Sequence, residues 1–150
     1  MAWNPLTTLQ VVTSHLKVGG RYDHVQIGEP KEPPTGQLTA CVIMSGVRTP
    51  ETVLDAPVRV YDLLVRLYMS MLDPGTDTET RMARTVGETL EDFEGDFTLG
   101  GNVRAVDFGG VYGASVEARW GYVEVGGKMY RMCDISVPLI VDPAAATFVA

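Results

Sequence analysis

Residues 76–97 carry the most regular pattern in the chain. Their apolar side chains recur in steps of four, four, three and four, at Met82, Val86, Leu90, Phe93 and Phe97. That spacing places all of them on one stripe of an α-helix and cannot place them on one face of a strand. Thr76 and Glu79 make a capping-box pattern for the start of the helix, and Gly95 is its expected end. We predict a helix whose apolar stripe packs against the core.

The segments on both sides of this helix have strand patterns. Residues 37–47 are apolar on both faces, which favours a central place in a sheet. Residues 57–72 alternate as a long strand, with a helix as the alternative. Residues 114–125 and 128–141 also alternate, and the glycine pair between them is typical of a two-residue hairpin turn. Pro138 favours an edge position for the last strand.

Shorter elements complete the prediction. Asn4 caps a first helix, Pro5 takes its first helical position, and a glycine pair ends it. We expect short strands at residues 22–27 and 98–108. This order predicts an α+β fold: a mostly antiparallel twisted sheet with an N-terminal helix and one central amphipathic helix packed on it.

The chain of 150 residues suits a single domain with two segments outside its regular elements. Residues 28–36 hold three prolines, which cannot donate to a β-ladder and favour a stiff, extended course. Two interpretations stay open for them: a surface loop, or an arm that reaches a neighbouring subunit. Residues 143–150 are small and apolar and form a short C-terminal tail.

Composition limits the classes of partner. No apolar run approaches the roughly 18 residues of a membrane-spanning helix, and no secretory signal pattern is visible, so we expect a soluble protein without a membrane partner. The formal charge is −7, and residues 51–100 hold the whole excess, with eleven acidic and four basic groups. A nucleic-acid binder would instead show a basic face. Cys41 and Cys133 lie in apolar contexts that favour buried free thiols, with a single disulfide as the alternative.

The residues that commonly carry catalysis are few and scattered. The two histidines, His15 and His24, lie in the predicted first helix and first strand, and we interpret both as ordinary polar residues. The sequence contains no zinc-binding spacing, no nucleophile elbow and no phosphate-binding glycine motif. We therefore expect no enzymatic activity, no catalytic residue, no metal and no cofactor.

One acidic cluster needs its own interpretation. Five carboxylates fall within nine residues: Glu88, Glu91, Asp92, Glu94 and Asp96. Oxygen ligands at this density could hold a hard cation, but the calcium-loop pattern with its glycine and final glutamate is missing. On the predicted helix, Glu88, Glu91 and Asp92 also point away from the apolar stripe. We interpret the cluster as an acidic, solvated surface.

The whole pattern resembles a known family. The first helix, the long strands, the helix that continues into LEDFEGDFTLGGNVRAVD (residues 90–107) and the closing hairpin GYVEVGGKMYRMCDISVPLIVD (residues 121–142) are similar to tail terminator proteins of long, non-contractile-tailed bacteriophages (siphophages). The resemblance covers nearly the full chain. Strand order and glycine-rich turns carry it, and no invariant chemical motif does.

The resemblance implies a structural virion protein rather than an enzyme. Proteins of this family form a hexameric ring that caps the finished tail tube, stops the addition of tube subunits and presents a docking surface to the head connector or stopper protein. The implied partners are further copies of the chain, the tube protein, the connector, and DNA that passes through the lumen without specific binding. The implied location is the head-proximal end of the tail in the virion, and the host cytoplasm during assembly.

The resemblance also indicates candidate surfaces. Glu88, Glu91, Asp92, Glu94 and Asp96 become a candidate channel-facing surface, because an acidic lumen lets DNA slide without sticking. A second set becomes candidate contacts to a neighbouring subunit or to the tube: Glu29, Pro30, Lys31, Pro33, Pro34, Arg48, Thr49 and Glu51.

Two other functions stay open. A tail tube subunit or a head–tail joining protein would have a similar small fold, but a tube subunit polymerises without limit whereas a terminator stops at one ring. A small ligand-binding or hydrolytic α+β enzyme would instead show a pocket lined by His24, Asp23 or the acidic cluster.

Overall fold

The long strands and the central helix form where the sequence patterns predict them. The structure, a computed structural model, describes residues 3–34, 38–50, 58–71 and 75–141, except the side chains of Gly75 and Thr76. The predicted tail at 143–150 lies outside these residues. The elements are α1 (Pro5–Lys17), the 3-10 turn η1 (Val18–Gly20), β1 (His24–Ile27), β2 (Leu38–Arg48), β3 (Arg59–Ser70), α2 (Gly75–Gly95), β4 (Ala105–Val106), β5 (Glu117–Val125) and β6 (Lys128–Val141).

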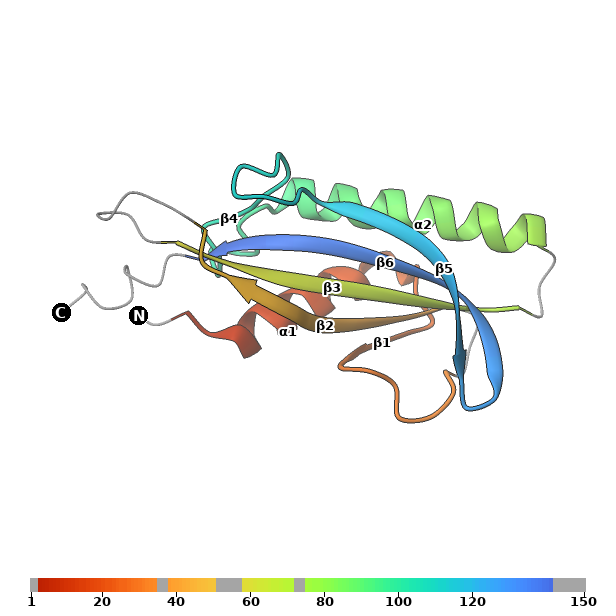
Figure 1. The fold of residues 1–150 in the computed structure, drawn as a ribbon. Coiled ribbons are helices and arrows are strands. Elements are labelled where there is room, and N and C mark those ends of the chain that lie inside the picture. The colour runs from red at the N-terminus through yellow and green to blue at the C-terminus, as the bar shows by residue number, and fades with distance from the viewer. Residues whose placement is uncertain (1–2, 35–37, 51–57, 72–74, 142–150) are drawn as a thin grey trace.

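This order confirms the predicted α+β fold (Figure 1). The segment that could have been a strand or a helix forms the strand β3. Asn4 caps α1 as predicted, since its side chain accepts a hydrogen bond from the backbone N–H of Thr7. Gly126 and Gly127 both have positive φ, 58° and 82°, which suits the predicted primed hairpin turn between β5 and β6.

One sheet holds the strands in the order β1-β2-β3-β6-β4. β5 also pairs with β6, because β6 is long enough for two partners along one side: residues 128–136 pair with β5, and Leu139 and Ile140 pair with β4. The pairing of β1 with β2 is parallel, and the other pairings are antiparallel. β3 and β6 pair over the full length of β3 and form the centre of the sheet.

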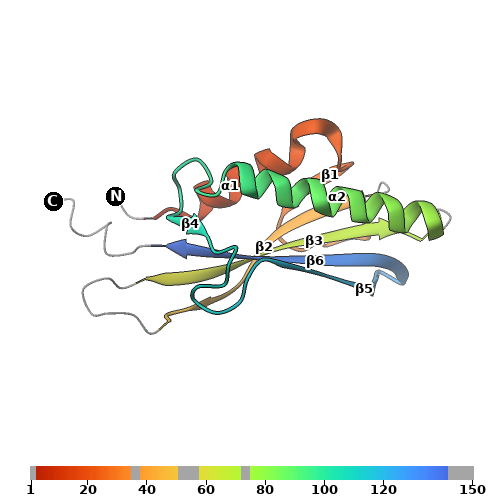
Figure 2. The ribbon, with the colours of Figure 1, turned by 90° about the horizontal axis from the view of Figure 1, so that it is seen from above.

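Both helices pack on one face of the sheet, which we call the helix face (Figure 2). α1 lies over β1 and β2, and α2 lies over β3 and β6. The buried core between them includes Val12, Leu16, Met82, Val86, Phe93, Leu63, Val65, Ile135 and Val137. Burial of these side chains supplies the main force that holds the helices on the sheet.

The opposite face, which we call the open face, is crossed by residues 28–34, the strap (Figure 1). Because β1 and β2 are parallel, the chain between them must run back along the strands, a path that a helix usually takes. The helices already cover the other face, so the strap takes the open one. There Cys41, Tyr68 and Tyr130 form a second buried cluster, which explains why β2 is apolar on both faces.

The apolar stripe predicted for the central helix is wrong at its last position. α2 ends at Gly95, and the Phe97 side chain is 52% exposed. Leu99 is fully buried instead, with a positive φ of 49°. Once the chain leaves the helix, the period of 3.6 residues no longer decides which way a side chain points.

The predicted start of α2 also needs correction. The helix begins at Gly75, so Thr76 lies within its first turn and is not the N-cap. The Glu79 carboxylate is bound by the Arg131 guanidinium, with Nε–Oε1 at 2.6 Å. The predicted capping-box residues therefore do not coincide with the start of the helix.

Two strand predictions are wrong in part. Pro138 does not lie on an edge strand, because β6 is flanked by β3 on one side and by β4 and β5 on the other. Its carbonyl accepts from Asp107 N on the β4 side, and β5 pairing stops at Ser136, so the missing Pro138 N–H falls at the break between two partners. Of residues 98–108, only Ala105 and Val106 form a strand.

Phe93 and Phe97 allow a direct test of the core. Phe93→Ala should lower the free energy of unfolding by about 3–5 kcal/mol, because it empties a fully packed site. Phe97→Ala is the matched control and should lower it by less than about 1 kcal/mol, because the ring is half exposed. Urea unfolding followed by circular dichroism measures both. Equal losses at the two positions would contradict this packing.

Candidate assembly surfaces

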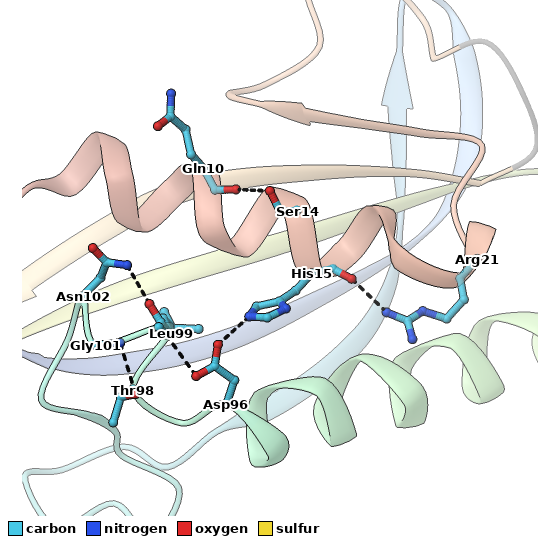
Figure 3. Close-up of polar contacts among 10 residues, drawn as sticks. Gln10, Ser14, His15, Arg21, Asp96, Thr98, Leu99, Gly101 and Asn102 are labelled. Carbon is cyan, nitrogen blue, oxygen red and sulfur yellow. Dashed lines mark hydrogen bonds and ion pairs between the residues drawn. The ribbon is translucent and has the colours of Figure 1, made fainter.

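The acidic cluster divides between two sides of α2. Three of its carboxylates face the end of α1 and the turn after it. Arg21 donates to Asp92 and lies 3.9 Å from Glu88, measured from Nε to Oε2. Beyond the helix, Asp96 Oδ2 lies 2.7 Å from His15 Nε2 (Figure 3). These three carboxylates join the end of α2 to α1 and to the turn after it, through the Arg21 ion pairs and the His15–Asp96 hydrogen bond, at partly shielded positions.

Asp96 also stabilises the turn that follows α2. Its Oδ1 accepts from the backbone N–H of Gly100 at 3.0 Å, and its main-chain carbonyl accepts from Leu99 N. The Gly100 hydrogen bond, followed by the hydrogen bond to His15, lowers the pKa of Asp96 below its ordinary value. A lowered carboxyl pKa adds stability above the ordinary pKa, and this stability is lost as the pH falls through the lowered value.

Glu91 and Glu94 lie on the outer side of α2, and both are exposed. Among the residues that the structure describes, neither carboxylate has an ion pair or a side-chain hydrogen bond. Arg84 is exposed two turns earlier on the same side. The sequence predicted an acidic, solvated surface of five carboxylates. In the structure only Glu91 and Glu94 form such a surface.

The strap is bound to its own sheet. Glu29 accepts a hydrogen bond from the Tyr68 hydroxyl at 2.6 Å and pairs with Arg66 at 2.9 Å. Arg66 in turn forms a two-pronged ion pair with Asp134 across β3 and β6. Burial, with the Glu29 hydrogen bond second, raises the pKa of Tyr68. At the other end of the strap, the Tyr130 hydroxyl donates to Pro34 O at 3.3 Å.

The other predicted contact residues have mixed positions. Lys31 and Thr49 are exposed, whereas Pro30 and Pro33 are half-buried. Arg48 pairs with Asp62 on the open face, with Nη1–Oδ2 at 2.6 Å. Glu51 lies outside the described residues.

A cavity of ≈ 570 Å³ lies between β1 and the strap, and His24, Glu29 and Thr39 help to line it. His24 contacts Gln26, with Nε2–Oε1 at 3.1 Å. Asp23 accepts from Leu38 N and lies 3.6 Å from Arg81. The hydrolytic hypothesis needed a pocket at this place. Of the residues that this hypothesis named, His24 lines the cavity, whereas Asp23 and the acidic cluster are not among its described lining residues.

The described residues also bear on metal binding, membrane spanning and thiol chemistry. They contain no group of three His, Cys, Asp or Glu side chains that could hold a metal ion. No helix within residues 3–34 or 75–141 is long and apolar enough to cross a membrane. Cys41 and Cys133 are free and fully buried, as predicted, on the open face and the helix face respectively. Burial raises the pKa of each thiol to about 12.

Sequence reasoning missed two features of these surfaces. It did not single out Arg21, which pairs with Asp92; a lone arginine after a helix carries no signal of its own. The alternation of residues 114–125 also gives no sign that Trp120 and Tyr122, on its apolar side, are exposed. The structure leaves them 40% and 60% exposed, because α2 packs mainly over β3 and β6.

No protein-family model matches the sequence, and no curated protein matches it. Among solved structures, the chain is similar to the sheath/tube terminator of PVC, an extracellular contractile injection system, in its extended state. The two sequences are 9% identical, the TM-score is 0.47, and the match covers 95% of this chain. It covers 57% of the other chain, so this chain spans little more than half of that length. A similarity at this level assigns no function by itself.

Adjacent acidic residues on α2 test the division of the cluster. Asp92→Lys should lower the free energy of unfolding by about 1–2 kcal/mol, because it places a second cation against the largely buried Arg21. Glu91→Lys is the matched control and should change it by less than about 0.5 kcal/mol, because the side chain is exposed. Urea unfolding at low salt measures both. If Asp92→Lys left the free energy of unfolding unchanged, this ion pair would not be what holds α2 to the turn after α1.

The modification rates of Cys41 and Cys133 test how firmly the strap is held on the sheet. Glu29→Ala should speed modification of Cys41 by a thiol reagent by about tenfold, because it removes the anchor to Arg66 and Tyr68 and favours local opening. Glu32→Ala is the matched control, since Glu32 is exposed on the same strap. Cys133, beneath the helices, should react at an unchanged rate in both variants. Equal acceleration of both thiols would indicate general unfolding instead.

Proposed function

We propose that this protein is a tail terminator: a structural virion protein that forms a ring on the end of the phage tail tube. The observation that carries the proposal is the order of elements along the chain. The resemblance to terminators of non-contractile tails depends on that order, and α1, β1, the long strands β2 and β3, α2, the short β4 and the closing hairpin β5–β6 follow it. The proposal is a non-enzymatic role.

The proposed ring is hexameric and stops the growth of the tube. Its partners are other copies of the chain, the last ring of tube protein, and the head connector or stopper protein. DNA passes through the lumen without specific binding. On this proposal the protein acts at the head-proximal end of the tail, after assembly in the host cytoplasm.

Glu91 and Glu94 are the proposed channel-facing residues. They are the exposed carboxylates of the acidic cluster, whereas Glu88, Asp92 and Asp96 face basic partners within the chain. An unpaired negative charge repels the phosphates of passing DNA, which favours sliding over adhesion.

Electron microscopy of the purified protein, alone and mixed with tail tubes, tests the proposal. We expect rings of one size and tubes that carry a single cap and no longer accept tube subunits. Growth of the protein into long tubes would identify a tube subunit instead. A strict monomer that never binds tube ends would contradict the proposal.

Charge reversal tests the channel assignment. Glu91→Lys/Glu94→Lys should leave ring formation intact and lower plaque titre by at least about tenfold when it replaces the phage's own copy, because cations in the lumen hold DNA. The control, Gln10→Lys/Glu32→Lys, adds positive charge at exposed residues of α1 and the strap. Equal titres for the two double variants would place this side of α2 outside the channel.

A further inference from the structure

In the described part of the chain, the sheet has an outer edge at β1 and another at β5. Within the described residues, no strand pairs with the outer side of β1, and β5 pairs with β6 alone. Natural proteins usually protect a long edge with proline, inward-pointing charge, a bulge or a covering segment, because free backbone groups recruit another strand. The nine residues of β5 contain no proline or lysine, and their register with β6 runs without a shift. The β5 edge therefore lacks several of these protections.

The same strand carries exposed aromatic side chains. Trp120 and Tyr122 are paired in register with Cys133 and Arg131, so both lie on the helix face. Met129, on the adjacent strand, is 51% exposed on this face, and the Arg131 guanidinium lies over the Tyr122 ring at 4.6 Å. An exposed apolar patch beside an unprotected edge indicates a contact surface for another strand.

The side chains of β5 indicate which kind of strand could pair with its outer edge. Along residues 117–122 its helix face offers Trp120 and Tyr122, and its open face offers the charged Glu117 and Arg119. The last part of β5 differs, with Glu124 on the helix face and Val123 and Val125 on the open face, so residues 117–122 are the stretch that a partner strand would meet. A matching strand therefore needs apolar side chains on the helix face and polar ones on the open face. β1 has this pattern: its register with β2 places Val25 and Ile27 on the helix face.

The polar side of β1 matches as well. His24 and Gln26 pair in register with Thr39 and Cys41, which places them on the open face. Ile27 is 45% exposed although it faces the apolar side, so it is available to contact an aromatic ring. Cross-strand pairs between aromatic and β-branched side chains are among the favourable pairs in sheets.

We propose that the outer edge of β5 in one copy binds the outer edge of β1 in the next copy, so that the sheet continues from subunit to subunit. This joint rests on the proposed ring function. It is heterologous, because two different edges meet, and such a contact can close into a ring. Pairing of β5 with β5 would instead give a two-fold dimer and leave β1 unused.

Disulfide cross-linking tests the joint. The variant carries Ile27→Cys with Tyr122→Cys, and Trp120→Cys replaces Tyr122→Cys in a second version to cover an alternative register. Neighbouring side chains on paired strands are close enough for a disulfide. Cys41→Ala and Cys133→Ala remove the native thiols. A parallel set retains them, since both are buried and this set does not depend on the alanine variants folding.

Oxidised samples are separated by mass under denaturing conditions. We expect the double variants to give a ladder that extends beyond the dimer, and each single cysteine variant to stay a monomer. A covalent dimer from Tyr122→Cys or Trp120→Cys alone would overturn the proposal in favour of β5–β5 pairing. No cross-link in any variant would overturn it too.

Light scattering and tube binding of the reduced protein separate this joint from the proposed function. Rings that cap tubes but yield no ladder would disprove the β5–β1 contact and leave the terminator function standing. A protein that is monomeric and does not bind tubes would disprove both.

Discussion

The antiparallel pairing of β3 with β6 is the interaction on which the rest of the structure depends. The pairing runs from Arg59 opposite Val141 to Ser70 opposite Tyr130, and these strands carry buried side chains on both faces. On the helix face they form the floor for α2, and on the open face the Arg66–Asp134 pair joins the two strands. A one-residue shift in this register would exchange the two faces and remove both layers at once.

The helix face and the open face are covered by different kinds of structure. The reason is that the connection between the parallel strands β1 and β2 has to cross one face of the sheet. An amphipathic helix covers the helix face by burying an apolar stripe, a contact that tolerates small shifts. The strap covers the open face with few apolar side chains and relies on the Glu29 carboxylate and the Pro34 carbonyl. Since prolines in the strap cannot donate backbone hydrogen bonds, its hold on the sheet depends more on these side-chain contacts. The strap is thus the layer that a single charge change can loosen.

The acidic cluster shows how a charge pattern acquires different roles within one helix. Glu88 and Asp92 are one turn apart and meet Arg21, whereas Glu91 is rotated away from it and is exposed. The first two contribute to helix packing, and the third is left for a surface role. Within the described residues, the outer edges of β1 and β5 have no partner strand, and the proposed joint would use them and leave the acidic side of α2 free.

The sequence by itself determined the α+β class, the order of elements, the capped start of α1, the glycine hairpin and the buried thiols, because each depends on local period or on the dihedral preferences of single residues.

Tertiary structure decided the rest. Pro138 lies within the sheet, because a break between two partners of β6 accommodates its missing donor. Phe97 is exposed and Leu99 buried, because the chain leaves the helix at Gly95. Trp120 and Tyr122 occupy the apolar positions of an alternating strand, yet they are exposed, because α2 packs mainly over β3 and β6. No local pattern specifies how far a helix extends across a sheet, and that extent decides which apolar side chains stay exposed.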